Sequence, residues 1–158
     1  MILASSCGIG FANSKELTQH LQELEEIEKL FCMLKSELNY TRAPFEEVFF
    51  KMSQKINEPY KEWLLNLSES LKKKTRGNFY EIWKISIVEN FKQSTLKQDE
   101  IEDIKSLGKN LDYIDSISLY LDQLEYKIQH TREEYRLKRK LCQSMGIIGG
   151  LFLVILLL

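Results

Sequence analysis

Apolar side chains recur at steps of three and four residues through most of the chain, which places them on one face of an α-helix. The first such stripe runs from about Lys15 to Tyr40, and Asn13 with Glu16 has the spacing of a capping box at its start. Its apolar members are Leu17, Leu21, Leu24, Ile27, Phe31, Leu34 and Leu38. The pattern predicts a long first helix.

Three shorter stripes predict three further helices. Pro44 and Pro59 suit the first turns of the second and third helices, and Asn78 with Glu81 has capping spacing for the fourth. The apolar positions are Phe45, Val48, Phe49, Met52 and Ile56, then Tyr60, Leu64, Leu67 and Leu71, then Phe79, Ile82, Trp83, Ile87 and Phe91. Each set occupies one helical face.

The last third of the chain predicts a short fifth and a long sixth helix. We expect Asp99 and Glu102 to cap the fifth, which ends near Gly108, and Asp112 and Asp115 to open the sixth. The buried stripe of the sixth helix is Ile114, Ile117, Leu121, Leu124 and Ile128, and it fades beyond Gln129. No segment alternates with a period of two, so the prediction is an all-α bundle of about six helices over residues 14–140.

The C-terminal residues predict a transmembrane helix over 141–158. No charged side chain occurs in this stretch, and as a helix it would be about 27 Å long, close to the roughly 30 Å of a bilayer's hydrocarbon core. The alternative is a buried core helix. Lys138, Arg139 and Lys140 stand directly before it, and positive charge at one flank predicts that this flank and the bundle are cytoplasmic. We expect the sixth helix to continue unbroken into the bilayer.

Residues 1–13 are apolar or small and predict an N-terminal membrane segment. They make only about 18 Å of helix, which is short for a span. We expect them to be the end of a truncated span, with further apolar residues encoded upstream. The alternative is a short anchor at the membrane interface.

Small residues recur four apart in both apolar ends, as Ser6 with Gly10 and Gly146 with Gly150. This spacing lets helix backbones approach closely in lipid, and antiparallel spans would place the two pairs at matching depths. The residues expected to pack the membrane segments are Ser6, Gly10, Gly146, Gly149 and Gly150.

The charge balance and the reactive side chains argue against several functions. Lys and Arg number 22 against 23 Asp and Glu, which is not the basic excess of a nucleic-acid binder. Cys7, Cys32 and Cys142 form no CxxC pair and are expected to be reduced, buried hydrophobes. His20 and His130 lie on polar stretches and are expected to be solvated. We therefore predict no enzyme activity, metal, cofactor or small-molecule substrate.

Two surface features are candidate contact sites. The basic run Lys72, Lys73, Lys74 and Arg76 could touch anionic lipid headgroups or an acidic partner, although a solvated loop between helices is the alternative. The turn around Pro44 and Glu47 is a weaker candidate for partner contact.

Three stretches carry a resemblance to a known family: residues 34–47, with Glu37, Tyr40 and Pro44; residues 107–115; and the glycine-containing tail over 144–157. With them, the chain resembles stage III sporulation protein AB of endospore-forming bacteria over nearly its whole length. It departs from the family at Asp112, where members often have Gly, and at Ala43, which replaces a capping Thr.

The resemblance implies a scaffold in the mother-cell membrane around the forespore. The family is similar to F-type platform proteins of type II secretion and type IV pilus systems. Its helical domain is expected to face the mother-cell cytoplasm, to engage a secretion-type ATPase, and to contribute with other sporulation proteins to a channel into the forespore. The alternative is a membrane-tethered signalling or adaptor protein with a dimeric stalk, but Pro44, Pro59 and Gly77 interrupt the heptad seam that such a stalk needs.

Overall fold

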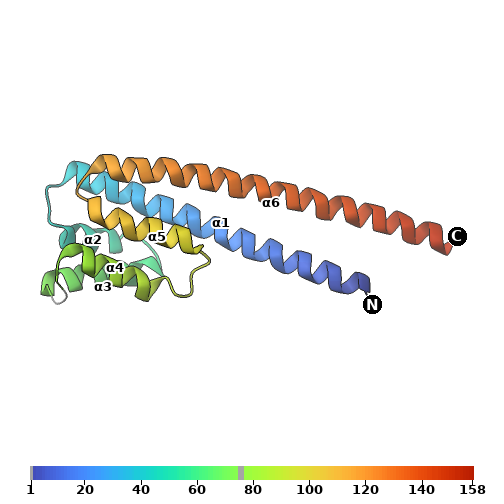
Figure 1. The fold of residues 1–158 in the computed structure, drawn as a ribbon, viewed down its shortest axis with the longest axis horizontal. Helices are drawn as coiled ribbons and strands as arrows, with labels where there is room; N and C mark the ends of the chain where they lie inside the picture. Colours follow the sequence, from blue (N-terminus) through green and yellow to red (C-terminus); the bar gives the residue numbers. More distant parts are fainter. Residues whose placement is uncertain (1, 75–76) are drawn as a thin grey trace.

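Two long antiparallel helices dominate the computed structural model of the protein, which describes residues 2–74 and 77–158, with residues 2–13 described by their backbone alone. These helices are α1 (Ile2–Tyr40) and α6 (Ile114–Leu157). They lie side by side within the bundle and project together from one side of it (Figure 1). The start of α1 and the end of α6 therefore lie on that side, which we call the proximal side, and the opposite side is the distal side.

The shorter helices pack against the distal half of this pair. They are α2 (Phe45–Ser53), α3 (Tyr60–Lys73), α4 (Phe79–Asn90) and α5 (Gln98–Leu107), and a short 3-10 turn, η1 (Gly108–Asn110), leads from α5 towards α6. The described residues contain six α-helices and no strand, which confirms the predicted all-α bundle. The predicted stripes supply most of its buried core.

Aromatic side chains occupy the centre of the core. The Trp83 ring lies 5.7 Å from that of Trp63 and 6.0 Å from that of Phe49, and all three side chains are fully buried. Each indole N–H is satisfied: Trp63 Nε1 donates to Ser86 Oγ at 3.2 Å, and Trp83 Nε1 donates to the Ile104 carbonyl oxygen at 3.0 Å. The core thus joins α3 and α4 to α5 by both packing and hydrogen bonds.

The sequence predicted the start of α4 correctly but not the start of α1. At α4 the Asn78 side chain accepts from the Glu81 N–H at 3.0 Å, as the spacing predicted. The expected start at Asn13 is wrong, because α1 is helical through that position and needs no cap there. Capping spacing therefore indicates a helix start only where the backbone before it is not helical.

The last two helices also begin differently from the prediction. At α5 the carboxylate that caps the helix belongs to Glu100, which accepts the Lys97 N–H at 2.8 Å, rather than to Asp99 or Glu102. Helix α6 begins at Ile114 without a side-chain cap, so Asp112 does not open it. It then continues without a break to Leu157, as expected.

Candidate membrane anchor and its link to the bundle

An ion pair fixes the register of α1 and α6 near the proximal end of the bundle. Arg132 Nη2 donates to Glu25 Oε1 at 2.7 Å, and Nε donates to the same oxygen at 3.3 Å. Both side chains are partly exposed, so the pair contributes on the order of 0.5 kcal/mol to stability. The main value of the ion pair is that it defines how the two helices are aligned, with residue 25 of α1 opposite residue 132 of α6.

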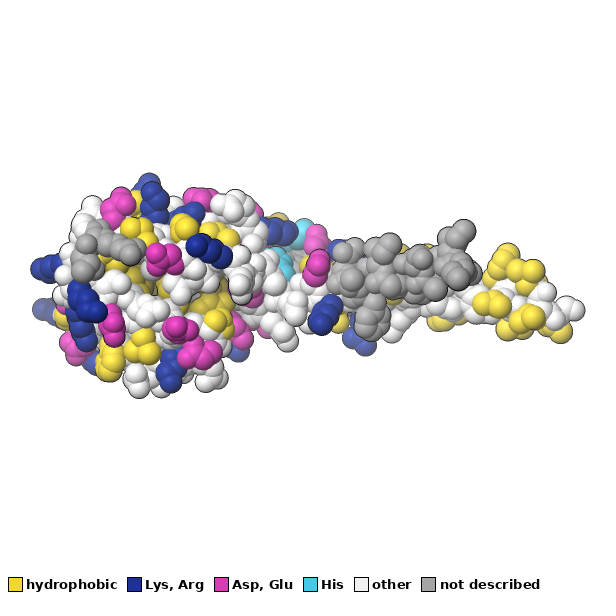
Figure 2. All heavy atoms as spheres, turned by 90° about the horizontal axis from the view of Figure 1, so that it is seen from below, with side chains coloured by type: hydrophobic (Ala, Val, Ile, Leu, Met, Phe, Trp, Pro, Cys, Tyr) yellow, Lys and Arg dark blue, Asp and Glu magenta, His cyan; other side chains and the backbone are white. Residues whose placement is uncertain are grey.

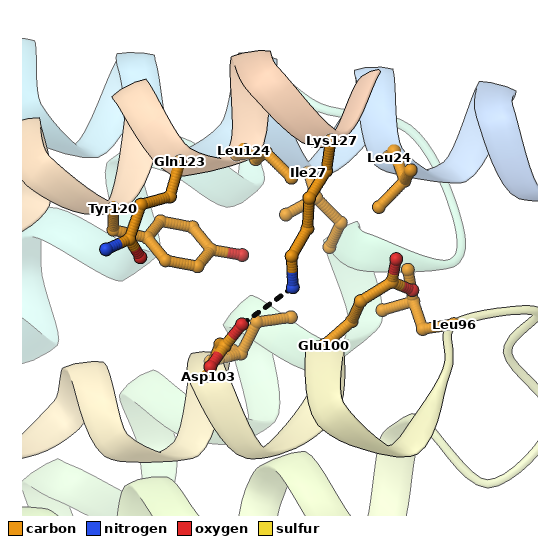
Figure 3. Close-up of a pocket in the computed structure, with 10 residues that line it drawn as sticks. Leu24, Ile27, Leu96, Glu100, Asp103, Tyr120, Gln123, Leu124 and Lys127 are labelled. Carbon is orange, nitrogen blue, oxygen red and sulfur yellow. Dashed lines mark hydrogen bonds and ion pairs between the residues drawn. The ribbon is translucent and has the colours of Figure 1, made fainter. Parts of the chain in front are cut away.

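Helix α6 is also tied to α5 through Lys127. Its ammonium donates to Asp103 Oδ2 at 2.8 Å and lies 3.5 Å from Asp99 Oδ2, and Figure 3 shows it directed towards α5. Burial alone would lower the pKa of Lys127. The hydrogen bond to Asp103 and the charges of Asp103 and Asp99 outweigh that effect, so its pKa is raised and the ammonium stays charged.

A buried pair, His20 and Glu100, ties α1 to the start of α5. His20 Nε2 lies 2.8 Å from Glu100 Oε2, and the side chains are only 8% and 7% exposed. The expectation that His20 is solvated is wrong, because its polar sequence neighbours point to other sides of the helix while His20 turns inward. His130 is 62% exposed and lies 3.8 Å from Glu134, as expected for a surface histidine.

The space beside these groups is too small for a substrate. The cavity between α5 and α6 has a volume of about 10 Å³, which is at the lower limit for one water molecule (Figure 3). Its lining is mainly apolar, with Glu100, Asp103 and Lys127 at its edge. The arrangement is suited to holding α5 and α6 together, and the described residues contain no cluster of potential metal ligands.

Beyond Thr131 the rest of α6 leaves the bundle and its apolar end is exposed. Leu151 and Phe152 are 59% and 65% exposed, and hydrophobic side chains cover the free C-terminal end in Figure 2, whereas charged ones are spread over the bundle. Among the described helices, α6 is long and apolar enough to cross a membrane, and none of its apolar stretch is buried in the protein. Continuous exposed apolar surface of this kind indicates a membrane or a partner.

The glycines predicted to pack the spans face open space. A Cβ added at Gly146, Gly149 or Gly150 would meet no atom within 4 Å. Ser6 and Gly10 lie outside the residues whose side chains are described, so the packing of two spans stays a prediction. The flanking cations Lys138, Arg139 and Lys140 are all exposed.

The candidate contact residues lie at the distal side. Lys72 and Lys73 form the last turn of α3, with Lys72 Nζ 5.1 Å from the centre of the Phe50 ring and Lys73 Nζ 3.5 Å from Glu69. Lys74 ends the helix in a left-handed conformation, and Arg76 lies outside the described residues. Pro44 and Glu47 are exposed at the start of α2, where Glu47 lies 3.5 Å from Lys51.

The cysteines differ from the prediction. Cys32 and Cys142 are exposed free thiols rather than buried hydrophobes, and Cys7 lies outside the residues whose side chains are described. Cys32 sits on the outer face of α1, where burial and the charge of Glu28 raise the pKa of its thiol. A raised pKa disfavours the reactive thiolate.

An all-helical bundle whose last helix runs on into an exposed apolar stretch of membrane length is a membrane-associated helical protein in architecture. The family model for stage III sporulation protein AB matches residues 1–158, and the chain belongs to that family. No curated protein matches the chain.

A solved structure supports the same fold. The structure titled "Stage III sporulation protein AB (SpoIIIAB)" superposes with a TM-score of 0.67 at 18% sequence identity, over 75% of this chain and 97% of that one. The family assigns the chain a role in sporulation among other sporulation proteins, and it is not a known enzyme family.

Proposed function

We propose that this chain is a non-enzymatic membrane scaffold in the channel between mother cell and forespore, where its bundle engages a cytoplasmic secretion-type ATPase. The observation that carries the proposal is the unbroken α6, which joins the bundle to the apolar tail without a hinge. A scaffold needs this continuity, because a flexible linker would let the bundle rotate freely relative to the membrane.

The basic flank supports a cytoplasmic bundle. Lys138, Arg139 and Lys140 would lie among the headgroups on the cytoplasmic side, with the tail crossing the mother-cell membrane around the forespore. The bundle would then stand in the mother-cell cytoplasm, on the side where an ATPase has access to nucleotide.

The distal side is the face offered to that ATPase. Along α6, Ile114 lies about 39 Å from Lys140 at 1.5 Å per residue. This distance is several times the Debye length of about 8 Å in physiological salt, so Lys72, Lys73 and Lys74 would feel little attraction from headgroups. An acidic protein surface is therefore their proposed contact, together with the turn at Pro44 and Glu47.

Two matched leucine substitutions test the anchor. Leu137 and Leu151 are 61% and 59% exposed on the same helix, but only Leu151 lies in the uncharged tail. Leu151→Arg should cost about 3 kcal/mol of membrane insertion and release the protein from membranes on alkaline carbonate extraction. Leu137→Arg should leave it in the pellet. Equal retention of both variants would contradict the proposed anchor.

A charge reversal tests the partner. The Lys72→Glu/Lys73→Glu/Lys74→Glu variant should lose co-purification with the secretion-type ATPase from sporulating cells while keeping its membrane fraction. A Lys109→Glu variant, which changes an exposed distal lysine on η1, serves as the control. Undiminished co-purification of the triple variant would refute this contact.

A further inference from the structure

A groove opens on the proximal side of the bundle, between α1, the start of α3 and the loop that joins α4 to α5. Its volume is about 760 Å³. In Figure 1 the α4–α5 loop lies on the side from which α1 and α6 project. The groove is therefore turned towards the membrane end of the protein, away from the distal lysines.

The floor of the groove is aromatic. Tyr60, Trp63 and Phe91 line it, and each is at most 5% exposed. The Trp63 and Phe91 rings meet edge to face at 5.2 Å, which fixes the shape of this floor. Because these rings are almost fully buried, they set the shape of the floor and offer little contact surface of their own.

The walls of the groove are acidic. Glu23, Glu26, Glu62 and Glu89 line it, against the single cation Lys92. Glu23 Oε2 accepts the Thr95 N–H at 2.7 Å and so holds the α4–α5 loop in place, while Glu26, Glu62 and Glu89 are exposed. A groove lined by four carboxylates and one cation is complementary in charge to a segment rich in Lys and Arg.

The chain itself carries such a segment close to the level of the groove, measured along the axes of α1 and α6. Residues 135–140 of α6 include the four cations Arg136, Lys138, Arg139 and Lys140 and no carboxylate. Because Arg132 stands opposite Glu25, a step of about 9 Å towards the tail reaches Lys138 on α6 and Gln19 on α1. Gln19 and Gln22 are therefore level with this basic segment, whereas Glu23 and Glu26 lie about 2 Å and 6 Å further from the tail than its first residue, which is within the length of a Lys or Arg side chain.

The basic segment cannot fill the groove of its own chain. Gln19, Gln22, Glu23 and Glu26 are spaced as one helical stripe, whereas Glu25, which contacts α6, lies about 100° further round the helix. Helix α6 is straight through residues 135–140 and stays on its own side of α1 (Figure 1). A second copy anchored in the same membrane would present the segment at this level, from which its Arg and Lys side chains can reach the groove carboxylates.

We propose that the acidic groove of one copy binds residues 135–140 of a neighbouring copy. The contact rests on the membrane anchoring proposed above, since the bilayer sets the common height. Groove and segment are different surfaces, so the contact is head-to-tail and can repeat from one copy to the next. It would also remove part of the basic flank from the lipid headgroups.

The test is carbodiimide crosslinking of the full chain in phosphatidylcholine vesicles, using an equal mixture of copies labelled with ¹⁴N and ¹⁵N. Carbodiimide joins a carboxylate to an amine in direct contact, and peptides of mixed isotope identify links between copies. We expect such links from Glu26 or Glu62 to Lys138, the lysine of the segment nearest to the level of the groove. Glu26→Gln/Glu62→Gln, assayed through the remaining groove carboxylates, should reduce crosslinked dimer about tenfold. Asp112→Asn, at an exposed distal carboxylate, should leave it unchanged.

Carbonate extraction of the same vesicles separates the two possible failures. Protein released by carbonate refutes the anchor and the contact together. Protein retained in the membrane without links between groove and segment, or with dimer unaffected by the double substitution, refutes the contact alone. Circular dichroism checks that the glutamine variants keep the helical content of the parent.

Discussion

Gly108 is the position where the smallest change should do the most damage to the bundle. Its φ of −58° is an ordinary helical value, so glycine is not needed there for its backbone freedom. It is needed for space: a Cβ would lie 2.6 Å from Trp83 Nε1 and 2.7 Å from Cγ, closer than real Cβ contacts. Trp83 is fully buried and cannot move aside without disturbing its aromatic neighbours.

The cost of Gly108→Ala can be built from two parts. Forcing a methyl group into a filled core costs roughly 1–3 kcal/mol. If the indole shifts, the hydrogen bond from Trp83 Nε1 to the Ile104 carbonyl oxygen is weakened, and a buried donor without its partner costs about 1–3 kcal/mol more. We expect the free energy of unfolding to fall by about 3 kcal/mol, which for a chain of this size lowers Tm by roughly 6–12 °C.

The assay is urea unfolding of the full chain in detergent, followed by the fluorescence of the two tryptophans, Trp63 and Trp83. Gly149→Ala is the matched control, because a Cβ there meets nothing within 4 Å. It should leave the midpoint of the bundle unchanged. A Gly108→Ala midpoint equal to that of the parent would refute the reasoning, since it would mean that the indole has room to move.

Three further predictions concern stability and assembly. Burial raises the pKa of the Tyr120 hydroxyl, so above about pH 10 the unfolded chain loses a proton that the folded chain keeps; the free energy of unfolding should then fall as pH rises, and less steeply in Tyr120→Phe than in Tyr126→Phe. His20→Ala removes one of the two hydrogen-bond partners of the buried Glu100 carboxylate, which keeps the Lys97 N–H, and should cost about 1–3 kcal/mol by urea unfolding, whereas the exposed His130 should tolerate Ala. Gly150→Leu should block close packing of spans and reduce crosslinked assemblies in membranes.

Each of these predictions has a result that contradicts it. Identical alkaline profiles of the two tyrosine variants would mean that Tyr120 titrates normally in the folded protein. If the two histidine variants lose equal free energy of unfolding, the burial of the His20–Glu100 pair does not add to its contribution to stability. If Gly150→Leu leaves assembly at the level of Ile148→Leu, the control on the opposite face of the tail, the small residues have no packing role.

The sequence was a good guide to the helices because their formation depends on neighbours three and four residues away. The stripe from Leu24 to Leu34 is buried as predicted, and α6 loses its buried face after Thr131, close to where the pattern fades at Gln129. The tail was equally easy to predict, because a long uncharged apolar run can be recognised without knowing its contacts in the fold. Only the caps of α1, α5 and α6 were misplaced.

The links between helices could not be read in this way. His20 meets Glu100 across 80 residues, and Arg132 meets Glu25 across 107. A polar side chain on a polar stretch gives no local sign that it will turn inward to a partner on another helix. The proximal groove escaped prediction for the same reason, because its carboxylates come from α1, α3 and α4 and are brought together only by packing.

The absence of a break in α6 has a mechanical consequence. The helix is 44 residues long, about 66 Å, and it is braced against α1 and α5 along its first half by Arg132, Lys127 and the packed core. With the tail in the bilayer as proposed, the helix would act as a lever that pivots at the membrane surface. A tilt of about 10° at that pivot displaces the far end, roughly 39 Å away, by about 7 Å. In that arrangement, a force on the distal end of α6 would exert a torque on the tail in the bilayer.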